Sequence, residues 1–260
     1  MGDGELESRD QAVTPDAGST DAAPARRRPA RRSLPSRLWR WVLRLCAGFF
    51  ALSVLLTAIY QTLPPPITIL MIGGLVEGRG IHKDWTPIEQ ISPDLVRSVI
   101  AAEDAHFCEH HGFDWTSIQA AWEKIEQGSS RLRGGSTISN QTAKNVFLWP
   151  GRNWTRKGLE AYFTVLIELI WGKQRIMEVY LNVIEFGPGI YGAEAASQRF
   201  FKKSAAELTR YQAALLAAVL PNPDEWSAAD PGPYVRKRAN TIMVRALDAP
   251  DAGAAVCPGR

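Results

Sequence analysis

Residues 45–63 read LCAGFFALSVLLTAIYQTL, a run of 19 residues without a charged side chain. At about 1.5 Å per residue, a helix over this run reaches roughly 28 Å, close to the ~30 Å hydrocarbon thickness of a bilayer. Trp39 and Trp41 precede the run, where aromatic side chains gather at a membrane interface, and three prolines at 64–66 end it. The run predicts one transmembrane helix over residues 38–63.

A buried core helix and a cleaved signal peptide are the alternatives to a membrane anchor. A signal peptide begins near the N-terminus and ends in a small-residue cleavage site. This run begins at residue 45 and ends in Leu-Pro-Pro-Pro. We therefore expect the segment to be retained as an anchor.

The net charge of +3 lies within the first 44 residues. Residues 26–44 contain eight arginines and no acid, residues 1–25 contain six acids and one arginine, and residues 45–260 are neutral in sum. By the positive-inside rule, the arginines keep the N-terminal flank in the cytoplasm and put everything after the prolines outside. Residues 1–37 have too few apolar side chains to fold and are expected to form a disordered cytoplasmic tail. Nucleic-acid binding is the alternative use of the arginines, but beside a membrane they more often set topology and contact anionic lipids.

Beyond the prolines the hydrophobic pattern is mostly helical, and strand-like alternation is scarce. Ser92-Pro93-Asp94 is typical of a helix start. Helices are expected over residues 93–105, 115–127, 137–145, 155–171, 174–183, 192–200 and 205–220. The sequence predicts a mainly α domain over residues 64–248 and a C-terminal tail over residues 249–260. Three widely spaced cysteines exclude a disulfide scaffold.

Ionisable side chains crowd residues 103–114, which read EDAHFCEHHGFD. Glu103 falls near the C-terminal end of a predicted helix, where the helix dipole disfavours a carboxylate unless local donors compensate. Such a glutamate is a candidate acid or base, and a solvated helix end is the alternative. A zinc site is a further alternative, because His106 and His110 are four residues apart with Cys108 between them. The HExxH pattern of zinc proteases is absent.

Residues 133–145 read RGGSTISNQTAKN, a glycine pair that leads into a predicted helix. Ser136 and Thr137 at the helix start offer hydroxyls and free backbone N–H groups, which suit phosphate oxygens. Lys144 follows two turns later and adds charge. An ordinary turn with an N-cap is the alternative, and the Walker A pattern is missing.

Arg156, Lys157 and Glu160 project to one side of a predicted helix, because residues three and four apart share a helix face. Thr164 and Glu168 continue that side, while nearly every other direction is apolar. A surface ion-pair face is the alternative. A narrow charged stripe on such a helix favours a cleft over open solvent.

Four segments in this order resemble the motifs of the monofunctional biosynthetic peptidoglycan transglycosylases, relatives of the glycosyltransferase domain of class A penicillin-binding proteins. They read EDAHFCEHHGFDW at 103–115, RGGSTISNQTAKNVFLW at 133–149, RKGLEAYFTVLIEL at 156–169 and EVYLNVIEFGPGIYGAEAAS at 178–197. The resemblance implies a mainly α, lysozyme-like glycosyltransferase domain with a small membrane-proximal jaw, to which we assign residues 67–76 and 147–149. It also implies a bacterial inner-membrane, single-pass enzyme with a periplasmic catalytic domain, which polymerises lipid II into β-1,4-linked glycan strands.

The same resemblance assigns the site residues. It implies Glu103 as the base that activates the acceptor 4-hydroxyl and Glu160 as the second catalytic glutamate, near the donor diphosphate. The implied substrate-binding residues are Asp104, Ser136, Thr137, Gln141, Lys144, Arg156 and Lys157. A divalent cation, Mg²⁺ or Mn²⁺, is implied, with Glu160 as its one candidate protein ligand through the diphosphate, and no organic cofactor. The implied partners are lipid II, the growing lipid-linked strand, the inner membrane and proteins of cell-wall synthesis and division, without nucleic acid.

Two residues depart from the family's pattern. Asn140 stands where glutamine is common, so a hydrogen bond in the cleft is expected to be lost or bridged by water. Gln212 stands where glutamate is common, and a local change in capping or packing is expected. The motifs SxxK and KTG are missing, so no transpeptidase half is expected. The sequence leaves open whether Cys108 and Cys257 pair.

A lysozyme-like peptidoglycan hydrolase and a catalytically silent, membrane-tethered scaffold are the competing functions. A hydrolase acts on a neutral leaving group, so it has little use for Lys144, Arg156 and Lys157. Its glutamate should also be protonated rather than ionised. The two glutamates Glu103 and Glu160 argue against a silent scaffold, and the polymerase is the preferred interpretation.

Overall fold

The computed structural model describes residues 34–126, 135–151, 153–249 and 256–257. The chain divides into two compact units, residues 1–47 and residues 48–260. Of the tail predicted over residues 1–37, the first 33 residues lie outside the described part, and so does most of the tail predicted after residue 248. Within the described ranges the structure has ten α-helices and three very short strands. The mainly α prediction is confirmed.

Helix α1 (Leu34–Tyr60) contains the predicted membrane segment. Its stretch Arg37–Tyr60, with a mean hydropathy of 2.2, is the one candidate membrane span among the described residues. The helix ends at Tyr60, a few residues before the three prolines at 64–66. Its last turns, from Gly48 on, belong to the second compact unit.

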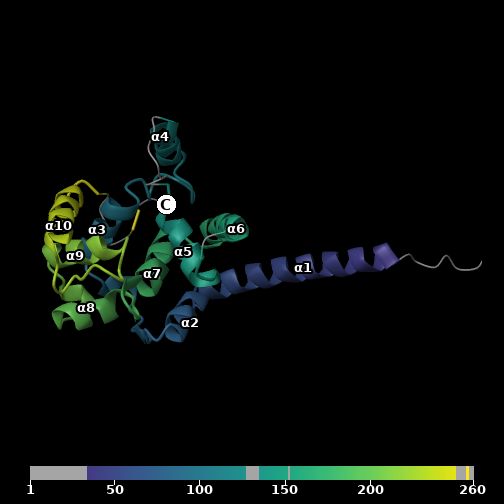
Figure 1. Cartoon of the computed structure of the whole chain (residues 1–260), viewed down its shortest axis with the longest axis horizontal. Coiled ribbons are helices and arrows are strands. Elements are labelled where there is room, and N and C mark those ends of the chain that lie inside the picture. Colours follow the sequence, from purple (N-terminus) through teal and green to yellow (C-terminus); the bar gives the residue numbers. More distant parts are fainter. Residues whose placement is uncertain (1–33, 127–134, 152, 250–255, 258–260) are drawn as a thin grey trace, which may run out of the picture. The chain divides into compact units, whose positions relative to one another are not determined.

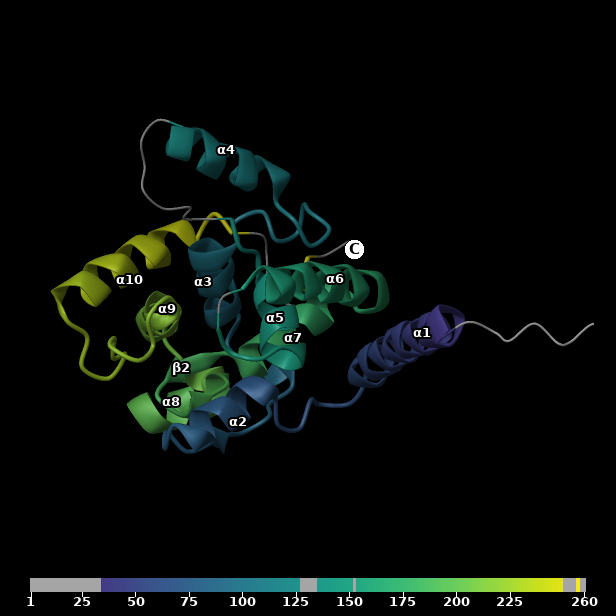
Figure 2. The same cartoon turned by 45° about the vertical axis from the view of Figure 1, so that its right-hand side comes forward.

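The other helices form the body of the second unit, shown in Figures 1 and 2. They are α2 (Ile69–Val76), α3 (Pro93–Glu103), α4 (Trp115–Glu126), α5 (Ile138–Phe147), α6 (Trp154–Ile170), α7 (Lys173–Val183), α8 (Ala193–Phe201), α9 (Arg210–Val219) and α10 (Pro233–Arg245). Six of these correspond to predicted helices with bounds shifted by one or two residues. The sequence pattern did not predict α2 or α10.

The helix predicted over residues 205–220 is in fact two elements, a 3-10 turn at Ala205–Glu207 and α9. The break has a local cause, because Thr209 caps α9. The Thr209 hydroxyl accepts a hydrogen bond from the Gln212 backbone N–H at 3.3 Å, and the Gln212 side chain accepts one from the Thr209 N–H at 3.1 Å. Gln212 thus completes a capping box here, and its expected difference from glutamate stays a prediction.

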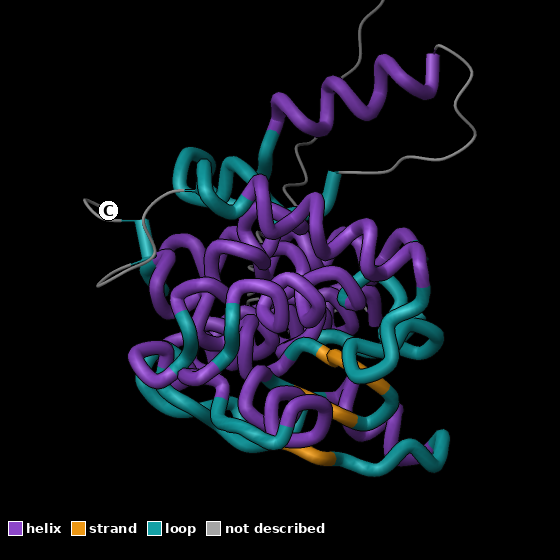
Figure 3. Tube along the Cα trace, turned by 90° about the vertical axis from the view of Figure 1, so that its left-hand side faces the viewer, coloured by secondary structure: helices purple, strands orange, loops and turns teal. Residues whose placement is uncertain are grey.

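Three short strands form a small sheet beside the helices (Figure 3). They are β1 (His82–Lys83), β2 (Glu185–Gly187) and β3 (Ile190–Tyr191), in the order β1-β3-β2, with β1 parallel and β2 antiparallel to β3. The turn between β2 and β3 requires Gly189, whose φ is +71°. A Cβ atom there would lie 2.2 Å from the Arg79 carbonyl oxygen.

Two groups of packed helices build the core. Helix α9 packs between α3 and α10, and α5 packs against α6 and α7. The inner faces of α7 and α9 are fully buried, with Met177, Tyr180 and Leu216 all at 0% exposure. The C-terminal end of α3 lies where the two groups meet, so side chains from α5 and α10 can both reach it.

The membrane-proximal assignment needs one correction. Of residues 147–149, only Trp149 is exposed, at 38%. Phe147 stacks on Phe163 with ring centroids 4.4 Å apart, and Leu148 is buried. Phe147 and Leu148 therefore belong to the core, whereas α2 exposes Ile69, Ile72, Leu75 and Val76.

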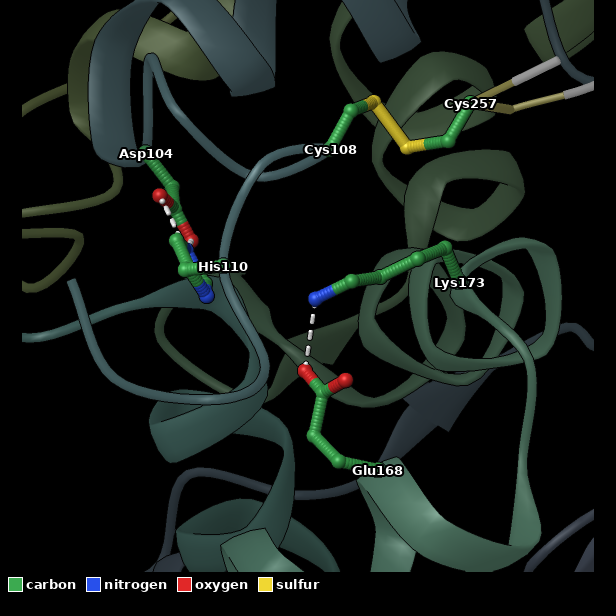
Figure 4. Close-up of a disulfide and its surroundings, with 6 residues drawn as sticks. All are labelled: Asp104, Cys108, His110, Glu168, Lys173 and Cys257. Atoms are coloured by element: carbon green, nitrogen blue, oxygen red, sulfur yellow. Dashed lines mark hydrogen bonds and ion pairs between the residues drawn. A yellow bond between two sulfur atoms is a disulfide. The ribbon is translucent and has the colours of Figure 1, made fainter. Parts of the chain in front are cut away.

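Cys108 and Cys257 form a disulfide across a sequence separation of 149 residues, with Cα atoms 5.3 Å apart (Figure 4). It joins the segment just after α3 to the C-terminal part of the chain. Val256 and Cys257 are buried as a result. The structure thus answers a question that the sequence left open, and Cys46 remains a free, exposed thiol.

Candidate active site

Glu103 is the last residue of α3, and donors from two other helices surround its carboxylate. Gln141 of α5 donates a hydrogen bond from Nε2 to Glu103 Oε2 at 3.0 Å. Arg238 of α10 places Nη2 3.6 Å from Glu103 Oε1. Burial raises the pKa of Glu103, while Gln141, Arg238 and Lys144 oppose that rise. The donors that a carboxylate needs at a helix C-terminus are therefore present.

Lys144 interacts electrostatically with both Glu103 and Glu160. Burial lowers the pKa of Lys144, the charges of Glu160 and Glu103 raise it, and those of Arg156 and Lys157 lower it. One lysine therefore lies within electrostatic reach of both carboxylates. Sequence segments that begin at residues 103, 133 and 156 meet in one site.

Glu160 is buried between two cations of its own helix. Arg156 Nη1 lies 3.1 Å from Glu160 Oε2, and Lys157 donates to Glu160 Oε1. The side chain of Arg156 is 10% exposed and that of Lys157 is 51% exposed. Together with Lys144, the cluster holds three basic groups against one carboxylate.

Asp104 directly follows Glu103 and ties two segments together. Its carboxylate accepts hydrogen bonds from His110 Nε2 at 2.9 and 3.1 Å and from the Ile138 backbone N–H at 2.9 Å. Figure 4 shows the contact with His110. The first N–H group of α5 is thus occupied by a carboxylate of the protein itself.

Two backbone N–H groups at the start of α5, where phosphate binding was predicted, are instead bonded to the protein's own side chains. Besides Ile138, the Asn140 N–H bonds the Thr137 hydroxyl at 3.1 Å, in a capping box. The Thr137 hydroxyl in turn donates to the Gly112 carbonyl at 2.7 Å, so it is engaged inside the protein. The ordinary N-cap, which was the alternative interpretation, describes this helix start.

Asn140 is buried, and both polar atoms of its side chain have partners inside the protein. Its side-chain oxygen accepts from the Thr137 N–H at 3.3 Å, and its Nδ2 donates to the Thr164 hydroxyl at 3.0 Å and to the Gly112 carbonyl at 3.3 Å. The shorter amide completes the capping box, and the expected loss of a bond that glutamine would make stays a prediction.

A cavity of about 150 Å³ opens beside Glu103, and Ser136 is an exposed residue in its lining. Asp104, Asp114 and Ser117 also line it. The cavity is polar, with two further carboxylates close to the candidate base. It offers room for a hydroxyl-rich ligand next to Glu103.

The histidines and the thiol of the zinc alternative have other partners. His106 Nδ1 lies 2.9 Å from Asp114 Oδ2, His110 is bonded to Asp104, and Cys108 is in the disulfide. Across the described ranges, no three His, Cys, Asp or Glu side chains are grouped so that they could hold a metal ion.

The charged stripe on α6 faces α5 along its later turns. The Thr164 hydroxyl accepts from Asn140, and Glu168 accepts from Ser139 and, at 2.7 Å, from Lys173. Only the first turns of the stripe take part in the candidate site. The prediction that the stripe turns away from open solvent is confirmed for Arg156, Glu160, Thr164 and Glu168, but it is wrong for Lys157, which is exposed. Thr164 and Glu168 support the interior and lie outside the candidate site.

Two residues around Glu103 were missed by the sequence analysis. Arg238 lies in α10, far beyond the four quoted segments, and no pattern around it pointed to the site. Tyr180 lies inside the segment 178–197, and its hydroxyl donates to Gln141 Oε1 at 3.2 Å. A buried tyrosine in an apolar helix is indistinguishable from core until its hydroxyl partner is known.

Comparison with known proteins gives one consistent result. The profile of the family described as Transglycosylase matches residues 72–247. The chain is 58% identical over 212 residues to the biosynthetic peptidoglycan transglycosylase of Caulobacter vibrioides, covering 82% of this chain and 90% of that relative. It is 54% identical over 217 residues to the protein of the same name from Pseudomonas aeruginosa, covering 81% of this chain and 91% of that relative.

Proposed function

The chain belongs to the transglycosylase family, as a relative of the biosynthetic peptidoglycan transglycosylases, and from this premise we propose how its cleft performs the transfer. The protein is a peptidoglycan glycosyltransferase of cell-wall biosynthesis. In our proposal, Glu103 is the general base and the cluster around Glu160 receives the leaving group. Lipid II is the acceptor, and the lipid-linked growing strand is the donor.

The proposed reaction is a single inverting displacement. The acceptor 4-hydroxyl gives its proton to the Glu103 carboxylate while its oxygen attacks the anomeric carbon of the donor sugar. The bond from that carbon to the diphosphate breaks, and its electron pair leaves with the diphosphate. Attack from the opposite face converts the α-linked donor into a β-1,4 product. Glu103 must be ionised for this step, and both Gln141 and Arg238 favour the ionised form.

The observation that carries the proposal is the surplus of positive charge around Glu160. Lys144, Arg156 and Lys157 surround one carboxylate. Arg156 Nε is buried without a hydrogen-bond partner in the described part of the chain, so it keeps a donor for an anionic oxygen. Such cations stabilise charge that develops on a departing diphosphate. A hydrolase of glycosidic bonds releases a neutral group and gains nothing from them.

The donor set does not fit a preformed site for Mg²⁺ or Mn²⁺. Glu160 is a single carboxylate, and Arg156 and Lys157 engage both of its oxygens. Mg²⁺ is commonly held by one or two carboxylates together with substrate phosphates. We propose that a divalent cation arrives on the diphosphate, and no step of the reaction is assigned to it.

We further propose that part of the catalytic body lies at the depth of the bilayer. The end of α1 packs on α6, where the Ser53 and Tyr162 hydroxyls are 2.6 Å apart, and Trp171 Nε1 donates to the Thr57 carbonyl at 2.7 Å. Residues 37–48 of α1 reach only about 18 Å, so a ~30 Å hydrocarbon layer must also include residues that pack on α6. The exposed Leu169 and the apolar face of α2 would then contact lipid.

The disulfide supports the proposed orientation. Cys108 and Cys257 pair in the part of the chain that follows α1, and structural disulfides persist in oxidising compartments such as the periplasm. The arginines before α1 favour the same topology. We propose a cytoplasmic N-terminus and a periplasmic catalytic body. Partner proteins of cell-wall synthesis and division remain a prediction from the resemblance.

Polymerisation of lipid II by the full-length protein tests the proposed function. Glu103→Gln should abolish formation of lysozyme-sensitive glycan polymer, with a loss of at least about 10³-fold, because the amide cannot accept the proton. Glu123→Gln, an exposed residue of α4, is the matched control and should retain wild-type activity. Equal activity of Glu103→Gln and wild type would contradict the proposal, and release of fragments from isolated peptidoglycan would favour the hydrolase.

A further inference from the structure

Two hydrogen bonds link α7 to the Glu103 carboxylate through α5, and in each the donor lies on the side away from Glu103. The Tyr180 hydroxyl donates to Gln141 Oε1 at 3.2 Å, and Gln141 Nε2 donates to Glu103 Oε2 at 3.0 Å. We propose that Tyr180 is a positioning residue that fixes the orientation of the Gln141 amide and thereby holds Glu103 as a base. This inference rests on the proposed role of Glu103 in transfer.

The orientation of an amide decides which form of a carboxyl group it stabilises. With Nε2 toward Glu103, the amide donates, and a donor favours the ionised carboxylate. With the amide turned over, Oε1 would face Glu103 and would favour a protonated carboxyl group, the form that a general acid needs. The same glutamine can therefore support either a transferase or a hydrolase state of Glu103.

Tyr180 selects the first orientation because its hydroxyl has to donate. The side chain is fully buried, and burial raises its pKa well above the usual value, so the hydroxyl keeps its proton. Among the described residues, Gln141 provides the one acceptor for that proton. Turning the amide over would point Nε2 at the hydroxyl and leave a buried O–H without an acceptor, which is unfavourable.

The other charges around Glu103 act on the same equilibrium without fixing the amide. Arg238 of α10 and Lys144 of α5 favour the ionised form, and the adjacent Asp104 disfavours it. Asp104 is itself bonded to His110, and Asp114 lines the neighbouring cavity. None of these groups hydrogen-bonds the Gln141 amide in the described part of the chain. Tyr180 is therefore the group whose removal frees the amide to turn.

The test is the pH dependence of lipid II polymerisation by the full-length protein, measured as kcat for wild type and Tyr180→Phe. Loss of the hydroxyl should move the acid limb of the profile up by about one pH unit, which is about tenfold in rate at the acid end. Activity should return to within about twofold of wild type on the alkaline side of the limb. Tyr191→Phe is the matched control, because Tyr191 is equally buried but its hydroxyl hydrogen-bonds Glu185.

A merely structural role would lower kcat by the same factor at every pH. An acid limb at the wild-type position in Tyr180→Phe overturns the inference, whether or not the rate falls. Gln141→Met tests the second step, from the amide to Glu103, and should shift the limb in the same direction. An unmoved limb in this variant overturns the inference even if Tyr180→Phe does not fold, as judged by thermal unfolding. In the folded double variant the two shifts should not add, and additive shifts would also overturn the inference.

The two proposals fail in distinguishable ways. Wild-type protein that makes no polymer at any pH contradicts the proposed function itself. Wild-type protein that polymerises lipid II with an acid limb, together with an unmoved limb in Tyr180→Phe, contradicts only the role of Tyr180.

Discussion

Two helix starts contribute to the site, and they treat charge in opposite ways. The start of α5 receives the Asp104 carboxylate on its first N–H group. The first turn of α6 carries Arg156 and Lys157, although cations are unfavourable at the positive end of a helix dipole. The protein therefore fills the first helix start with its own carboxylate and leaves a surplus of positive charge at the second. An anionic substrate is therefore expected at α6 rather than at α5.

Removing the internal anion at the start of α5 should have the largest effect. Asp104→Ala deprives His110 and the Ile138 N–H of a buried, charged acceptor. We expect the free energy of unfolding to fall by roughly 3–5 kcal/mol, as for other broken buried pairs. Urea titration measures it. An exposed-residue control, Asp230→Ala, should change it by less than about 0.5 kcal/mol.

The corresponding change at α6 should affect activity more than stability. Arg156→Gln combined with Lys157→Gln removes two cations from the cluster around Glu160. We expect kcat for lipid II polymerisation to fall about 10²–10³-fold, as when a donor to a developing oxyanion is lost. Lys203→Gln, which changes a half-buried cation elsewhere, serves as the control. A loss of activity that only parallels a loss of folded protein would contradict the assigned role.

The disulfide stabilises the segment that carries Asp104 and His110. Cys108→Ser with Cys257→Ser opens a link between residues 149 positions apart. We expect the free energy of unfolding to fall by about 2–4 kcal/mol, the usual effect of losing such a link. The same loss should appear when wild-type protein is unfolded with a reductant present. A variant as stable as oxidised wild type would show that the link carries no constraint.

A smaller effect on stability is expected from Asp114, a buried residue of the same segment. Burial alone would raise the pKa of Asp114, but hydrogen bonds from Ser117 and His106 outweigh it and lower the pKa to about 2. A lowered folded-state pKa adds stability that is present above the unfolded value of about 3.9 and is lost as pH falls toward 2. Asp114→Asn should cost roughly 2 kcal/mol at pH 7. The difference from wild type should shrink below about pH 4 in acid titrations of unfolding.

Periodicity and motif spacing were enough to predict α3, α5 and α6, which carry Glu103, Lys144 and Glu160. Glu103, Lys144 and Glu160 come from three separate segments, yet their residue types and their places on helices already pointed to a base and an anion-binding cluster. Predicting α10 was harder because its sequence PYVRKRANTIMVR is rich in charge and has a weak apolar stripe. Arg238 was missed with it.

The parts that the sequence could not provide depend on where side chains point after the segments meet. Phosphate binding at the start of α5 was predicted because Ser136 and Thr137 suit an anion. Only the folded segment after α3 shows that Asp104 reaches that helix start first. The link between Cys108 and Cys257 and the orientation of the Gln141 amide are likewise products of tertiary structure.

The most direct test of the proposed transfer is the ratio of released lipid diphosphate to new glycan bonds. Full-length protein is given lipid II, and the released lipid diphosphate is counted against the glycan bonds in the product. We expect one diphosphate to be released for each new β-1,4 bond. Glu103→Gln should lose both the diphosphate release and the bond formation. Diphosphate release that yields free disaccharide without polymer would show that water is the acceptor, and would contradict the proposed transfer.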